Sequence, residues 1–104
     1  MEVSISARHG SLTPEQHDYI EKKLPKLAHL FDKINMAKVT VDLTAHPPEV
    51  ELVVSEPRQT FVAKEQHDVV QAAFDNCLAK MEAQLRRHKE KLHDHHGGPD
   101  RHAL

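Results

Sequence analysis

Basic side chains recur at helical spacing near the end of the chain. On a helical wheel Lys80, Arg87 and Lys91 fall within about 40° of one another. They lie away from an apolar stripe whose members are spaced by threes, fours and sevens, namely Val70, Phe74, Cys77, Met81, Leu85 and Leu92. A helix with one buried and one cationic face is suited to hold an anion against a folded domain. The alternative is a solvated charged face in which Glu82 and Glu90 are the helix partners.

A second basic stripe occurs earlier in the chain. Thr13-Pro14-Glu15-Gln16 supplies a helix cap, a proline at the first helical position and a glutamine three residues after the cap. The helix that follows has an apolar stripe of Ile20, Leu24, Leu27, Phe31 and Ile34, and an opposite basic stripe of Lys22, Lys26, His29 and Lys33. Pro25 lies inside this helix and removes a backbone donor, which predicts a kink there.

The positive charge of the chain is concentrated in one segment. The formal net charge is −2, but residues 80–91 carry five Lys/Arg against two Asp/Glu, whereas residues 1–79 carry eight against twelve. Charges act mainly within a Debye length of roughly 8–10 Å. A locally basic surface is therefore compatible with a slightly acidic protein.

Four strand-like alternations complete the pattern of elements. They lie near residues 3–8, 38–43, 50–54 and 61–64, and a long helix follows that is predicted to be capped by Asp68 with Gln71 three residues on. The order is β-α-β-β-β-α, which predicts an α+β fold with one mixed four-stranded sheet and both helices packed on one face. Because each helix turns its apolar side to the same sheet, the two basic stripes are expected to be neighbours.

Composition excludes several classes of protein. At 104 residues the chain has room for one domain, and its single cysteine, Cys77, excludes an internal disulfide and is expected to be a buried packing thiol. The three glycines include no phosphate-binding loop, and no catalytic pair or triad spacing is present, so neither an enzyme nor a cofactor is expected. His93-Asp94-His95-His96 is interpreted as part of a polar tail and not as a metal site. No apolar run is long enough to span a membrane, and a soluble cytoplasmic protein is expected.

Three stretches resemble one known family. The opening Ile5-Ser6-Ala7-Arg8-His9, the stretch from Tyr19 to Leu27 and the motif from Lys80 to Lys91 are similar to the ribosome hibernation-promoting and ribosome-associated inhibitor family, also labelled the sigma-54 modulation protein family. The resemblance covers roughly residues 1–92. It implies a fold similar to double-stranded RNA-binding domains and binding to the small ribosomal subunit in the messenger and transfer RNA channel, which would silence ribosomes under stress or in stationary phase.

The resemblance also implies a set of residues that face ribosomal RNA. They are Arg8, Lys22, Lys23, Lys26, Lys33, Lys80, Arg86, Arg87, Lys89 and Lys91. Residues 1–92 are expected to form the ribosome-binding domain and residues 93–104 a flexible His-rich tail. Because long-form members dimerise through a second domain, a short form that is monomeric off the ribosome is implied. The alternative function is a protein-interaction regulatory module of the sigma-54 modulation type without RNA binding.

Overall fold

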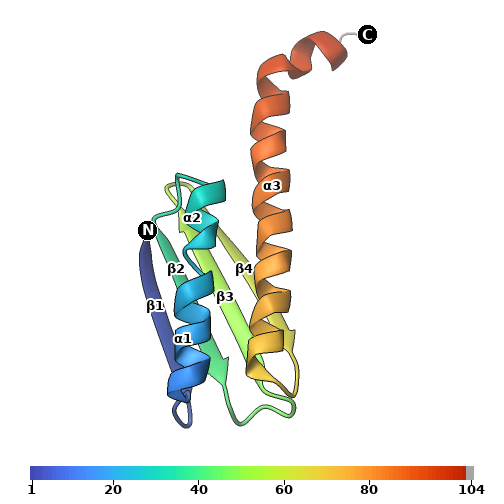
Figure 1. Ribbon diagram of the computed structural model, residues 1–104. Coiled ribbons are helices and arrows are strands. Elements are labelled where there is room, and N and C mark those ends of the chain that lie inside the picture. Colours follow the sequence, from blue (N-terminus) through green and yellow to red (C-terminus); the bar gives the residue numbers. More distant parts are fainter. Residues whose placement is uncertain (103–104) are drawn as a thin grey trace.

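The computed structural model describes the backbone of residues 1–102 and the side chains of residues 1–91. Its elements, in chain order, are β1 (Glu2–Arg8), α1 (Pro14–Lys23), α2 (Lys26–Leu30), β2 (Met36–Asp42), β3 (Glu49–Glu56), β4 (Gln59–Gln66) and α3 (Val70–His102). All helices lie on one face of a single sheet, and α3 continues well beyond the sheet edge (Figure 1). The predicted α+β class and the one-sided packing of the helices are confirmed.

The sheet is mixed, with strand order β1-β2-β3-β4. β1 pairs in parallel with β2, so that Ile5 lies opposite Val39, and the other two pairings are antiparallel. A parallel pair requires a crossover, which α1 and α2 provide, whereas the two antiparallel pairs need only short hairpins. The connections therefore bring every helix to the same side.

The core lies between the sheet and the helices and is apolar throughout the described side chains. The sheet supplies alternate residues such as Val39, Val41 and Leu52, and α3 supplies Phe74 and Met81, all of them fully buried. Each such side chain contributes about 1.5–3 kcal/mol on burial. The predicted stripe of the last helix is buried from Val70 to Leu85, and Leu92 lies outside the described side chains.

The first helix is broken at Pro25, where the sequence predicts only a kink. α1 ends with Leu24 as its C-cap, and the Leu27 N–H donates to the Leu24 carbonyl at 3.1 Å, a tighter turn than that of an α-helix. α2 then ends at Leu30, because Phe31 takes an extended conformation with φ −140° and ψ 105°. Lys33 therefore lies in the turn after α2 and not on a helix.

The long helix begins one residue later than predicted. Its first residue is Val70, so Val69 occupies the cap position, and the predicted cap at Asp68 is wrong. The side chain that bonds the entering backbone is His67, whose Nδ1 accepts from the Val69 N–H at 2.9 Å. At the other end α3 continues through the histidine tract to His102. The division into a ribosome-binding domain of residues 1–92 and a flexible tail stays a prediction.

Candidate nucleic-acid interface

A polar network joins α1 to α3 on the helical face of the molecule. The Tyr19 hydroxyl donates to Asp75 Oδ2 at 2.6 Å, and Lys23 Nζ lies 3.2 Å from Asp75 Oδ1 and 2.8 Å from the Tyr19 oxygen. These bonds, first to Tyr19 and then to Asp75, raise the pKa of Lys23 above its usual value. Lys23 thus remains charged at neutral pH, but Asp75 offsets its charge.

The network fixes which flank of α3 faces α1 and α2. Arg86 follows Asp75 by eleven residues, or about three helical turns, and so lies on the same flank. Farther along, Lys89 Nζ lies 5.9 Å from the centroid of the Phe31 ring, just beyond α2. Asp75 and Lys89 therefore mark two points of one flank, and Arg86 lies between them.

The exposed cations around this flank form what we call the inner cluster. On the α1 side, Lys22 follows Tyr19 by three positions and shares its side of α1, and Lys26 is the first residue of α2. The members of the inner cluster are Lys22, Lys26, Lys33, Arg86 and Lys89, all exposed. Within residues 1–91, none of the five makes an ion pair. Their charge is available to an anionic partner.

Lys80, Arg87 and Lys91 form an outer cluster on the opposite flank of α3. Lys80 pairs with Glu65 of β4, which raises the pKa of Lys80 through a hydrogen bond and direct charge attraction. Arg87 and Lys91 border a shallow pocket with Gln59 and Phe61 of β4. The predicted side-by-side placement of this stripe and the first-helix stripe is therefore wrong. The helical wheel correctly places these three cations on one side of α3, but it does not determine which flank of α3 faces α1.

Arg8 lies apart from both clusters. It borders a polar pocket with Thr40, Glu51 and Lys64. These residues alternate with the buried residues of their strands, so they occupy the open face of the sheet, opposite the helices. Arg8 is therefore removed from the predicted helical interface, while the other nine predicted cations are all exposed on the helical side of the molecule.

Several residues of the interface were missed by sequence reasoning. The i, i+4 spacing of Tyr19 and Lys23 is a readable local signal for a contact. Their partner Asp75 lies more than fifty residues away, and only the docking of α1 on α3 brings it there. Glu65 beside Lys80 depends in the same way on the packing of α3 over β4.

Two other groups of residues, Cys77 and the surface group that includes His17, do not indicate a functional site. Cys77 is buried, its thiol donates to the Val50 carbonyl at 3.2 Å, and burial raises its pKa to about 12, as expected of a packing thiol. Within the described part of the chain, His17, Asp18 and Glu21 bring ligand atoms within 4.8 Å of one another, but they form a surface group of the kind that is common without an ion. No described helix combines the length and the apolar character that a membrane crossing requires.

Comparison with known proteins decides the family. The family described as "Sigma 54 modulation protein / S30EA ribosomal protein" matches residues 3–93. The chain belongs to this family. It is 34% identical over 91 residues to the ribosome hibernation promoting factor of Pseudomonas putida, and the match covers 88% of this chain and 89% of that protein. It is 29% identical over 97 residues to the protein of the same name from Escherichia coli, and that match covers 91% of this chain and 100% of the relative.

Solved structures agree with the fold. The crystal structure of the Protein Y N-terminal domain from Thermus thermophilus matches with a TM-score of 0.73 and 30% identity, covering 84% of this chain and 98% of that one. A ribosomal subunit interface protein from Coxiella burnetii matches with a TM-score of 0.79 at 22% identity, covering 86% of this chain and 99% of that one. The second likeness concerns the fold alone. Family membership and fold thus agree with the resemblance read from the sequence.

Proposed function

We propose that this protein is a ribosome hibernation factor that binds ribosomal RNA of the small subunit through its helical face and silences translation. The observation that carries the proposal is the inner cluster, five exposed cations without an ion pair within residues 1–91, gathered around the flank where α1 and α2 meet α3. Relatives that cover most of this chain bear the name ribosome hibernation promoting factor. The exposed cations and the similarity to these relatives together favour a ribosomal partner in the cytoplasm.

The cations suit recognition of folded RNA by its backbone. Lysine and arginine side chains contact phosphates, which position a protein without reading sequence. Folded RNA is recognised largely by shape and by its phosphates and 2′-hydroxyls. Since Asp75 offsets Lys23 and Glu65 offsets Lys80, the strongest phosphate contacts are expected from Lys26, Arg86 and Lys89.

Occupation of the messenger and transfer RNA channel would explain inhibition without chemistry. A small domain held there by phosphate contacts excludes the translation substrates by volume alone. This mechanism requires neither a catalytic residue nor a cofactor, and it predicts direct competition. Transfer RNA bound to small subunits should prevent binding of this protein, and excess protein should displace transfer RNA.

The test is the affinity of the labelled protein for purified small and large subunits between 50 and 200 mM salt. About six phosphate contacts predict a log–log salt slope of roughly −4 to −5, because each contact releases counterions. Small subunits should bind far more tightly than large ones. A nearly flat slope would point to the alternative, a protein-interaction module, since ordinary protein interfaces depend much less on phosphate neutralisation. Equal affinity for both subunits would contradict the proposed partner.

A further inference from the structure

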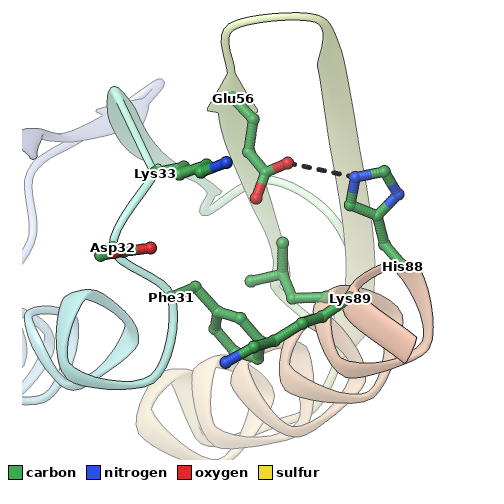
Figure 2. A pocket seen from close by; sticks show the side chains of 7 residues that line it. Phe31, Asp32, Lys33, Glu56, His88 and Lys89 are labelled. Atoms are coloured by element: carbon green, nitrogen blue, oxygen red, sulfur yellow. Dashed lines mark ion pairs between the residues drawn. The ribbon is translucent and has the colours of Figure 1, made fainter. Parts of the chain in front are cut away.

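A small cavity opens where the turn after α2 meets the end of β3 and the middle of α3. Its volume is about 160 Å³, well below the 300–1,000 Å³ of pockets for larger ligands. Figure 2 shows the side chains that surround it. They are Phe31, Asp32, Lys33, Glu56, Leu85, His88 and Lys89. The size fits one planar ring system and not a whole dinucleotide.

The cavity is lined by both acidic and basic side chains. Glu56, with a side chain only 15% exposed, turns its carboxylate into the cavity, and His88 Nε2 lies 3.3 Å from its Oε1 (Figure 2). His88 is held in turn by an edge contact with the Phe61 ring, with centroids 5.2 Å apart. Lys33 and Lys89, both exposed, line the cavity as well. A largely buried carboxylate therefore shares the cavity with two exposed cations.

This lining favours a ligand that carries both hydrogen-bond donors, for Glu56, and negative charge, for the two lysines. A free anion would meet the Glu56 carboxylate and be repelled, whereas N–H groups would be accepted by it. The walls of Phe31 and Leu85 favour an apolar or aromatic body between the two ends. Asp32 also lines the cavity and offsets part of the lysine charge, so a single phosphate is better matched there than a polyanion.

Among nucleobases, guanine fits this description best. Its Watson–Crick edge carries two adjacent donors, the ring N1–H and the exocyclic amino group, which a carboxylate can accept together. Adenine and cytosine place an acceptor nitrogen beside their single amino group, and uracil flanks its N–H with carbonyl oxygens. Unstacked bases in RNA are commonly held against aromatic side chains and bonded along this edge.

We propose that the cavity binds a guanine base with its 5′-phosphate, the Glu56 carboxylate accepting from the base and Lys33 and Lys89 contacting the phosphate. The nucleotide has two possible sources, an unpaired guanosine of ribosomal RNA or a free guanine nucleotide. The first source rests on the proposed function, because Lys33 and Lys89 also belong to the inner cluster. The second would make the cavity a ligand site beside the RNA interface.

The first experiment titrates the intact protein with GMP, AMP, CMP and UMP and follows the NMR signals of the Leu85 methyl groups and the His88 ring. GMP should shift both at roughly tenfold lower concentration than the other nucleotides, the discrimination expected of one bidentate pair. Glu56→Gln should remove this preference. The matched control is Glu51→Gln on the open sheet face, which should keep it. Equal shifts with all four nucleotides, or none at these residues, would overturn the proposal.

A second variant keeps the test decisive if Glu56→Gln unfolds. Lys33→Gln should weaken GMP binding several-fold and leave guanosine, which lacks the phosphate, unaffected. Equal loss for GMP and guanosine would contradict the proposed orientation. The affinity of the variants for small subunits then separates the two sources. A lower affinity of Glu56→Gln, or a greater loss in Lys33→Gln than in the control Lys22→Gln, indicates a ribosomal guanosine. Unchanged affinity indicates a free nucleotide. Failure of the wild-type protein to bind subunits would contradict the proposed function alone, since the GMP titration contains no ribosome.

Discussion

Lys23 Nζ lies 3.2 Å from the Asp75 carboxylate, across the contact between α1 and α3. Both side chains are nearly half exposed, so solvent screens the pair and its main effect is on the local potential. Asp75 is an anion at the edge of a surface that we propose binds phosphates. The residue that orders the contact between the helices therefore also weakens the proposed RNA interface.

Replacing Asp75 with Asn should tighten small-subunit binding several-fold. The change removes the carboxylate that offsets Lys23, while the amide oxygen can still accept from Tyr19. The pKa of Lys23 should fall toward its usual value, because one of its raising partners loses its charge, yet Lys23 stays protonated at neutral pH. Filter binding at low and high salt checks this: the gain should shrink as salt rises, and weaker binding at low salt would refute it.

The two clusters should differ in their effect on binding. Charge reversal at Lys26 and Lys89 of the inner cluster should weaken small-subunit binding more than reversal at Arg87 and Lys91 of the outer cluster, which faces the β4 edge. All four residues are exposed, so each change should alter the free energy of unfolding by no more than about 0.5 kcal/mol. Co-sedimentation and urea unfolding of both double variants measure the two effects. A larger loss from the outer pair would place the RNA on the other flank.

Comparison of the sequence predictions with the structure shows which features the local sequence determines. The burial of Ile20, Leu24 and Leu27 and of the α3 stripe follows from periodicity, and the strand alternation predicts the sheet, because both depend only on which residues share a face. The direction in which Lys80 points depends instead on how α3 docks over β4. Likewise, the end of α2 at Leu30 depends on Phe31, which is extended and buried in the core.

The helix cap at Thr13 should be a local source of stability. Its side chain accepts from the Gln16 N–H at 3.1 Å, and Gln16 Oε1 accepts from the Thr13 N–H at 2.9 Å. Thr13→Ala leaves the Gln16 N–H without its side-chain acceptor, whereas the backbone N–H of residue 13 can still donate to Gln16 Oε1, and the change should destabilise the protein by about 0.5–2 kcal/mol. Urea unfolding measures the change, with Ser11→Ala as the control outside the cap. An equal effect of both substitutions would mean that the cap contributes nothing specific.

Cys77 should be unreactive in the native protein and should make stability fall at high pH. Burial raises its pKa from 9.0 to about 12, so the folded state favours the protonated thiol. The resulting stabilisation is fully present below pH 9 and is lost as the pH rises from about 9 toward about 12. At pH 8, native alkylation by iodoacetamide should be at least about a thousandfold slower than in urea. Cys77→Ala should lose this part of the pH dependence, and rapid native labelling would contradict the burial argument.

The most direct test of the proposed RNA interface compares two triple variants of equal charge loss. One carries Lys26→Gln, Arg86→Gln and Lys89→Gln on the helical face, and the other carries Arg8→Gln, Lys38→Gln and Lys64→Gln on the open face of the sheet. The measurement is the affinity for purified small subunits as a function of salt. The helical-face variant should bind weakly with a slope flattened by roughly 2 to 3, since each lost phosphate contact removes about 0.7–0.9. The open-face variant should keep the wild-type slope. Equal losses in both, or an unchanged slope in the helical-face variant, would contradict binding through the helices.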